Sequence, residues 1–538
     1  MVGFITRKDI RKLSTPELDN LVKAFAAIQK LDPDDPDSFF SIAGLHGEPF
    51  RGAGYGNPSW WGGYCNHGNV LFPTWHRAYL LRLEQALQKQ VPGVALPYWD
   101  ETEDTTNRLD VIPGIFLQRR YTFDDKDKTT IDNPLFSYKF QRSVIDRLSP
   151  IPDANYTKPK DYRTVRYPFS GLVGTEKDKK KTEIHNERLD KMGEAETNRI
   201  LNDNVKMWLN LDHYESSDGE LHAAGVKKKY IDCLNAPNYT VFSNTTSAQR
   251  WNDDHSDTTG EVTIVPLESP HNSIHLALGG FNVPQPEQGP QPPNYSNYPY
   301  ANGDMGENDT ASFDPIFYFH HCFIDLTFWK WQVLHSKTDS FDIIEGYPGT
   351  NSVDSQGPTP GVAGGTWLTM NSPLDPFKMP GDAGVTLTSN DVVDIAKLGY
   401  AYEGVSRDGD RHHDYMSAPP SRDPAPVITV SNVNRASIGG SFVISTWTVK
   451  DGKEILVGTE PILSRWHVSG CQNCQSHLEV RAHMPLQGWM KEDAEKADVF
   501  ARVHTRNDSR DDVSNGHERA GEAVHEPPVC EISYGHLE

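Results

Sequence analysis

The sequence predicts a mainly α protein: a four-helix bundle core with long loops is followed by a β-sandwich-like domain. Three observations predict this fold class. Histidines recur in three short local sequences that lie in or beside stretches of helical apolar spacing. From Val427 onward the apolar period changes to two, which is typical of strands. The chain has 538 residues and 12 Trp, enough for more than one domain.

Four helices are expected in the bundle. The first begins near Ser14, where Ser-Thr-Pro-Glu supplies a cap and a proline in the first turn of an amphipathic stretch. The second begins at His76, which opens another stretch of helical apolar spacing. The third carries His271 and His275, whose i, i+4 spacing places both imidazoles on one helix face. The fourth covers about 314–334 and is apolar enough to be buried.

The remaining chain divides by composition. Residues from about 101 to 260 are polar and weakly periodic, which predicts surface loops with a few short helices. The first domain, which contains the helical bundle, is expected to cover 1–410, and a polar, Pro-rich linker follows over 411–426. The second domain is expected over 427–538, with a frayed, charged tail after about Ala501.

The histidines lie in specific local sequences. These are C-N-H-G-N-V-L-F-P-T-W-H-R from Cys65, E-S-P-H-N-S-I-H from Glu268 and D-P-I-F-Y-F-H-H-C-F-I-D from Asp314. Neutral imidazole is the commonest metal ligand. Two sets of three nitrogens without a carboxylate suit copper or zinc better than a hard cation.

These segments resemble the CuA and CuB motifs of the type-3 copper proteins, which are tyrosinases, catechol oxidases and molluscan haemocyanins. The likeness is closest to fungal tyrosinases, and it covers most of the first 400 residues in the right order. It implies two copper ions as cofactors and O₂ as co-substrate. It also implies a first copper on His46, His67 and His76, and a second copper on His271, His275 and His321.

The adjacent pair His320-His321 needs a choice, because neighbouring helical side chains diverge by about 100°. The family pattern selects His321 as the ligand and leaves His320 in the surrounding shell. Asp325 lies one turn further on and is a candidate to accept the other ring N–H of a ligand histidine.

Further roles follow from the same resemblance. Cys65 is expected to form a thioether with His67, the alternative being a reduced cysteine. Glu268 and Asn272 are expected to hold a water that deprotonates the substrate, although a glutamate there could also serve as an N-terminal helix charge.

The C-terminal domain is expected to act as a lid and as a copper handler. Cys471 and Cys474 form a C-x-x-C, for which copper delivery is the first interpretation and a disulfide the alternative. By family precedent an apolar side chain occupies the substrate pocket. The candidates are Ile462, Leu463 and Trp466, unless all three pack within the sandwich.

The function implied is that of a latent fungal tyrosinase, a zymogen that hydroxylates monophenols and oxidises o-diphenols to o-quinones, as in melanin formation. The substrates would be small phenols such as tyrosine, DOPA and catechols. A catechol oxidase and a haemocyanin-like oxygen carrier are the alternatives, and a homo-oligomer is left open.

Charge and hydropathy limit the partners and the location. The formal net charge of -22 disfavours nucleic acid and anionic membranes as partners. No run of apolar residues is long enough for a transmembrane span. The N-terminus lacks the apolar region of a secretory signal, so an intracellular, cytoplasmic location is expected.

Overall fold

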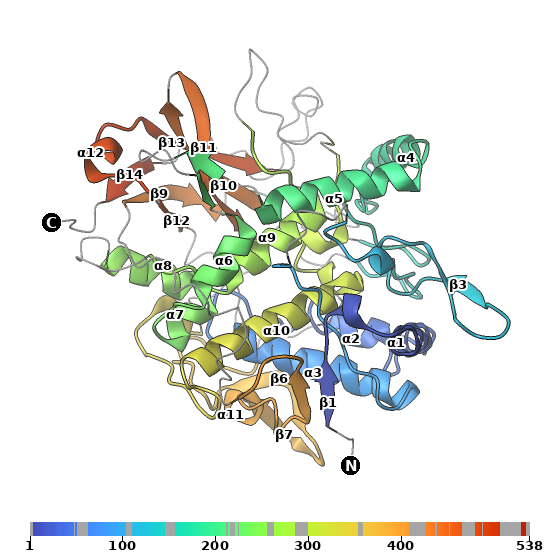
Figure 1. Cartoon of the computed structure of the whole chain (residues 1–538). Helices are drawn as coiled ribbons and strands as arrows, with labels where there is room; N and C mark the ends of the chain where they lie inside the picture. Colours follow the sequence, from blue (N-terminus) through green and yellow to red (C-terminus); the bar gives the residue numbers. More distant parts are fainter. Residues whose placement is uncertain are drawn as a thin grey trace.

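The computed structural model describes residues 4–505 and 529–533 with several gaps. The gaps are 48, 51–62, 104–109, 146–156, 211–212, 216–220, 224, 256–262, 286–297, 299, 353–358, 408–425, 436–437, 439, 451, 465–478 and 487. The described chain is mainly helical, and a group of strands near the C-terminus packs on one side of the helices (Figure 1). The predicted fold class is therefore confirmed.

The α-helices precede most of the strands along the chain. They are α1 (Thr15–Ile28), α2 (Phe39–Gly44), α3 (Phe72–Gln90), α4 (Glu176–Asp190), α5 (Glu194–Asn210), α6 (Val226–Cys233), α7 (Tyr239–Ser243), α8 (Thr245–Asp254), α9 (Glu268–Gly279), α10 (Ile316–Leu334), α11 (Ser389–Val392) and α12 (Lys491–Ala494). Single 3₁₀ turns join them: η1 (Ile10–Lys12), η2 (Gly114–Phe116), η3 (Asp304–Gly306), η4 (Ala311–Phe313) and η5 (Pro348–Thr350).

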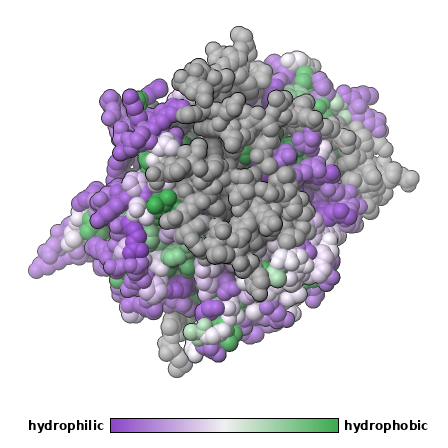
Figure 2. All heavy atoms as spheres, turned by 180° about the vertical axis from the view of Figure 1, so that it is seen from behind, coloured by the Kyte–Doolittle hydropathy of each residue, from purple (hydrophilic) through white to green (hydrophobic). Residues whose placement is uncertain are grey.

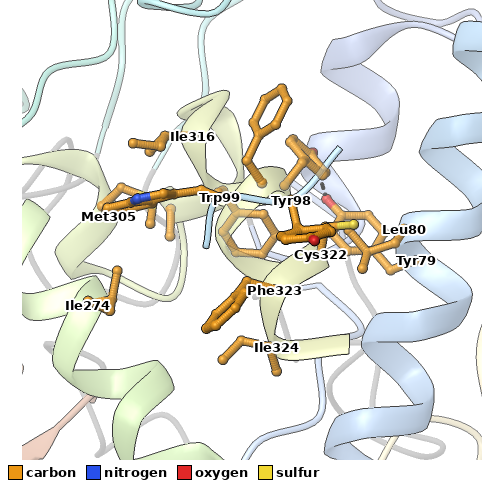
Figure 3. Close-up of a cluster of buried hydrophobic side chains, with 14 of the residues drawn as sticks. Tyr79, Leu80, Tyr98, Trp99, Ile274, Met305, Ile316, Cys322, Phe323 and Ile324 are labelled. Atoms are coloured by element: carbon orange, nitrogen blue, oxygen red, sulfur yellow. Dashed lines mark hydrogen bonds between the residues drawn. The ribbon is translucent and has the colours of Figure 1, made fainter. Parts of the chain in front are cut away.

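The centre of the helical part consists of α3, α9 and α10. Helix α3 packs against α1 and α10, while α9 packs against α5, α6, α10 and η3. Helix α10 is buried along almost its whole length, as expected of a helix that is apolar on every face. Figure 3 shows part of the core between these helices, in which Leu80 of α3, Ile274 of α9 and Phe323 of α10 are buried.

One prediction for the helices is confirmed and one needs correction. Helix α1 starts where expected, with Ser14 and Glu17 forming a capping box. The region from 101 to 260 contains more than a few short helices, because α4 and α5 have 15 and 17 residues. The sequence of α5 is polar on average, yet one face packs on α9 and buries Trp208.

Four short strand pairs accompany the described helices. Strand β1 (Ile5–Arg7) runs parallel to β8 (Tyr400–Tyr402), which joins the two ends of this part of the chain. Three antiparallel pairs form at the periphery: β2 (Arg120–Thr122) with β3 (Thr130–Asp132), β4 (His213–Glu215) with β5 (Leu221–Ala223), and β6 (Pro373–Met379) with β7 (Asp382–Thr388).

The remaining strands form the C-terminal sandwich, defined here as β9–β14. They are β9 (Val427–Asn434), β10 (Phe442–Lys450), β11 (Lys453–Ile462), β12 (Glu479–Pro485), β13 (Val499–Thr505) and β14 (Val529–Ser533). One sheet has the order β11-β10-β13 and the other β12-β9-β14. The two sheets share a hydrophobic cluster that includes Ile428, Phe442 and Val480. The tail was predicted to fray after Ala501, but β13 continues beyond it and β14 pairs with β9.

The C-terminal sandwich packs directly on the helical part, next to α6, α8 and α9 (Figure 1). On α9, Ser269 donates a hydrogen bond to Glu460 of β11, which also pairs with Lys229 of α6 at 3.1 Å. At α8, Asp253 accepts hydrogen bonds from His483 and Arg481 of β12, at 2.9 and 3.2 Å. These polar contacts hold the two parts in one arrangement.

No helix in the described parts of the chain is long and apolar enough to cross a membrane. On the face shown in Figure 2, the described residues are mostly hydrophilic, and hydrophobic residues lie scattered among them.

Candidate metal centre

The first three predicted ligands meet at the N-terminal end of α3. His46 follows α2, His67 lies in the loop before α3, and His76 belongs to α3 itself. Their ring centroids lie 5.3 Å (His46–His67), 5.5 Å (His46–His76) and 5.2 Å (His67–His76) apart. Two of these three rings therefore come from non-helical backbone, and only His76 lies on a helix, as expected.

The other three predicted ligands meet between α9 and α10. The Nε2 atom of His321 lies 3.2 Å from Nε2 of His271 and 3.3 Å from Nε2 of His275. All three rings are fully buried. Three nitrogen atoms therefore converge on one point inside the protein.

The two groups adjoin one another and form a single centre. His76 stacks on His321 with ring centroids 4.5 Å apart, and His67 lies 5.7 Å from His271. None of the six rings is more than 5% exposed. The six imidazoles therefore lie together in one buried region, as two adjoining groups of three.

Hydrogen bonds to the opposite ring nitrogen orient several of these histidines. Nδ1 of His46 lies 3.0 Å from the Asn308 carbonyl, Nδ1 of His76 lies 2.8 Å from the Phe72 carbonyl, and Nδ1 of His275 lies 2.7 Å from the Met305 carbonyl. A carbonyl oxygen can only accept, so each of these Nδ1 atoms carries the hydrogen. Nε2 is then the atom with a free lone pair, as metal-binding histidines require.

Four of the six rings are also neutral at ordinary pH. Burial lowers the pKa of His76 to about 3, and it lowers the pKa values of His271, His275 and His321 well below their usual range. Neighbouring imidazoles add to the effect, because each disfavours a positive charge on the next. An all-imidazole, neutral and buried donor set fits copper.

His320 lies at the second group as well. Its Nδ1 atom donates to Oε1 of Glu101 at 2.6 Å, and one of its ring nitrogens lies within 4.8 Å of a ring nitrogen of each of the other three histidines. Tyr230 donates a hydrogen bond to the same carboxyl group. Glu101 could not be predicted from a local motif, because it is 219 residues away from its histidine partner.

The expectation for Asp325 was wrong. Its Oδ1 atom accepts from Arg77 at 2.6 Å, and its Oδ2 atom accepts from Tyr400, Tyr402 and Arg7 at 2.7, 2.6 and 3.3 Å. Two arginines and two tyrosines donate hydrogen bonds to this carboxylate, in place of the predicted ligand histidine. Because Arg77 follows His76 in α3, this network instead joins α3 and α10, each of which carries a predicted ligand.

Glu268 and Asn272 lie beside the second group, at the beginning of α9. Glu268 is fully buried and accepts hydrogen bonds from the backbone N–H groups of Gly68 and Thr245, at 2.8 and 2.9 Å. Burial raises its pKa above the usual value, although these donors oppose the shift. The side-chain oxygen of Asn272 lies 3.0 Å from Nδ1 of His271.

Cys65 lies beside the first group. Its sulfur and one ring nitrogen each of His46 and His67 all lie within 4.8 Å of one another. The expected partner, His67, is therefore close to the thiol.

The residues expected at the tip of the C-terminal sandwich divide into two sets. Trp466, Cys471 and Cys474 lie outside the described residues. Ile462 is buried in the hydrophobic cluster of the sandwich, which agrees with the alternative interpretation for this residue. Leu463 is buried in the cluster of the helical part, so it crosses from one part to the other.

Comparison with known proteins identifies the family. Residues 36–334 match the family model described as the common central domain of tyrosinase. A tyrosinase from Aspergillus oryzae is 49% identical, and the alignment covers 93% of each chain. The chain belongs to the tyrosinase family. Tyrosinase HcTyr2 from a Hahella species is 43% identical over 92% of this chain and 89% of the relative.

Solved structures agree with this assignment. The structure of a tyrosinase from Burkholderia thailandensis at low pH superposes with a TM-score of 0.80 at 41% identity, covering 98% of this chain and 100% of that chain. An Aspergillus oryzae pro-tyrosinase mutant has a TM-score of 0.60 at 17% identity, with 94% of each chain covered, so it shows the shared fold alone. The family resemblance expected from the histidine motifs is confirmed. This tyrosinase-family chain is an enzyme that binds copper.

Proposed function

We propose that the protein is a latent tyrosinase that ortho-hydroxylates monophenols and oxidises o-diphenols to o-quinones with O₂. The observation that carries the proposal is the presence of six buried imidazoles in two adjoining groups of three. His46, His67 and His76 would hold one copper ion, and His271, His275 and His321 the other. Copper held there supplies the redox chemistry that activates O₂.

The substrate must lose its hydroxyl proton before its ring is attacked, and a phenol has a pKa of about 10. Glu268 would accept that proton through a water held with Asn272. Its pKa is raised by burial, which makes it a stronger base than an exposed glutamate. The Gly68 and Thr245 donors hold the carboxyl group in one orientation next to the ligand helix.

Cys65 would form a thioether with His67 and so fix a ring that lies on loop backbone. The close approach of the thiol to both His46 and His67 supports this proposal. Cys471 and Cys474 would deliver copper, because soft thiolates select Cu(I).

The C-terminal sandwich would act as the lid that keeps the enzyme latent. The contacts of Glu460, Arg481 and His483 with α6, α8 and α9 support this role, as does the burial of Leu463 in the helical part. We propose a catalytic domain over 1–410, a linker over 411–426 and the lid over 427–538. A fungal origin, a role in melanin formation and a cytoplasmic location complete the proposal.

A catechol oxidase and an oxygen carrier are the competing functions. A segment of a haemocyanin from Megathura crenulata is 36% identical over 143 residues, but the match covers only 4% of that protein. Relatives that align over nearly the whole chain are named tyrosinases. This favours the enzyme over the carrier.

Oxygen uptake tests the proposal. Copper-loaded full-length protein, and the same protein cut by protease within 403–430, are given tyrosine or DOPA in an oxygen electrode. We expect the cut enzyme to consume O₂ with both substrates and to show a lag with tyrosine. Uptake with DOPA alone would indicate a catechol oxidase, and reversible O₂ binding without turnover would indicate a carrier.

A further inference from the structure

One short segment touches a predicted ligand from each copper group. It is residues 303–308, called the bridging segment here, and it includes η3. The Met305 carbonyl accepts from Nδ1 of His275 at 2.7 Å, and the Asn308 carbonyl accepts from Nδ1 of His46 at 3.0 Å. A shift of this segment would therefore turn one imidazole in each group.

The helical part holds the bridging segment from one side. Asp304 pairs with Lys158 at 3.0 Å and accepts a hydrogen bond from Tyr162 at 2.6 Å, and all three groups are buried or half-buried. Gly303 donates its backbone N–H to the Gly279 carbonyl at the end of α9. Met305 is buried in the same cluster as Ile274 of α9 (Figure 3).

The segment also lies very close to the backbone of α9. A Cβ atom added at Gly279 would collide with the backbone of Gly306. Because the colliding atoms belong to the backbone, rotation of a side chain could not remove the clash. Helix α9 and the bridging segment therefore pack backbone to backbone. The space between them is too small for one to move without the other.

The C-terminal sandwich reaches the bridging segment between its two carbonyl acceptors. Ser441, directly before β10, is 1% exposed, and its hydroxyl donates to the Gly306 carbonyl at 3.1 Å. A hydroxyl has one hydrogen, and the alternative acceptor, the Ser464 carbonyl, lies further away at 3.3 Å. The Ser464 N–H donates to the same hydroxyl at 3.0 Å, next to Leu463 in the helical core.

We propose that Ser441 is a positioning residue for the copper ligands. Docking of the C-terminal sandwich holds the bridging segment through Gly306, and the segment holds His275 and His46 through its carbonyls. The sandwich then stabilises the bound copper in both groups, in addition to any effect it has on access to the site. This inference rests on the proposal that each group holds one copper ion.

Copper transfer to a chelator tests the inference. The copper content of the full-length protein is measured first, and transfer to excess bicinchoninate is then followed for the parent and for Ser441→Ala. Loss of a partner in the shell around metal ligands typically weakens binding about 10–100-fold. Ser441 does not touch a ligand histidine itself; it bonds to the segment whose carbonyls accept from His275 and His46. We therefore expect the low end of that range, with copper transfer from Ser441→Ala roughly tenfold faster than from the parent.

Two further variants keep the test specific. Ser441→Thr retains the hydroxyl and should restore slow transfer. Asp253→Asn weakens docking at α8, away from the bridging segment, and should change the transfer rate by less than about twofold. Equal rates in parent and Ser441→Ala, or equal acceleration by Asp253→Asn, would overturn the inference. A parent that binds other than two copper ions would instead contradict the proposed function.

Discussion

Glu268 is the residue on whose chemistry the proposed hydroxylation depends most. Replacement by Gln keeps the size of the side chain but removes its basicity. General acid–base groups typically contribute 10²–10⁴-fold to rate. We expect Glu268→Gln to lower kcat/KM for tyrosine by roughly 10²-fold, the lower end of that range, with a smaller loss for DOPA.

Steady-state assays with the protease-cut enzyme measure this ratio. Copper content should not change, since Glu268 is not one of the predicted ligands. Because burial raises its pKa, tyrosine turnover should fall with acidity at a pH above the usual glutamate value of 4.5. Glu187→Gln on the exposed side of α4 is the control, and an unchanged tyrosine-to-DOPA ratio in Glu268→Gln would rule out the assignment.

Cys65 allows a second test at the same scale. Formation of the thioether joins the sulfur to a ring carbon of His67 and releases two protons and two electrons, which copper and O₂ accept. Copper-exposed protein should therefore be lighter than copper-free protein by two hydrogen atoms on the peptide carrying both residues. Cys65→Ser should show no such difference in peptide mass spectrometry. The same mass before and after copper exposure of the parent would exclude the cross-link.

At the scale of single elements, one buried ion network fixes α3 against α10. Asp325 accepts from Arg77 and Arg7, whose side chains are completely buried. Burial alone would raise the pKa of Asp325, but the two arginines lower it below the usual value. The carboxylate therefore stays charged between them, and its loss would leave two buried positive charges short of a partner.

Asp325→Asn should accordingly destabilise the helical part strongly. Removal of one partner from a buried pair typically costs about 3–5 kcal/mol. We expect a loss of that size in the free energy of unfolding, measured by urea denaturation followed by circular dichroism. Asp203→Asn is the matched control, because its pair with Arg199 on α5 is exposed to solvent and should contribute little to stability. Equal losses in the two variants would contradict the structural role of the network.

The limits of the sequence are clearest at this scale. Apolar spacing and local motifs predicted α1, α3, α9 and α10, because these signals lie within a few residues of one another. The polar helix α5 was not predicted, because only one of its faces is apolar and its partner α9 is distant in the chain. Glu101 and the carbonyls of Met305 and Asn308 could not be found, because long-range packing alone brings them to the histidines.

At the scale of the whole molecule, the charged contacts between the C-terminal sandwich and the helices determine how acid should affect the proposed latency. Burial alone would raise the pKa of Asp253, but its hydrogen bond from His483 and the charge of Arg481 lower it below the usual 3.8. A carboxyl group whose pKa is depressed in the docked state stabilises docking above its undocked pKa. That contribution is lost as the pH falls through the lower, docked value.

Acid should therefore release the lid, and the release should begin below about pH 4, near the undocked pKa of an aspartate. The excess of 74 Asp and Glu over 52 Lys and Arg disappears as carboxylates are protonated, and the resulting positive charge adds repulsion between the two parts. We expect brief acid treatment to raise DOPA oxidation of full-length protein, assayed at neutral pH, towards that of a chain truncated near residue 410. In Asp253→Asn the C-terminal sandwich should be released at a higher pH than in the parent, because one stabilising carboxylate is already absent. If untreated full-length protein already turns over as fast as the truncated chain, the C-terminal sandwich is not a lid.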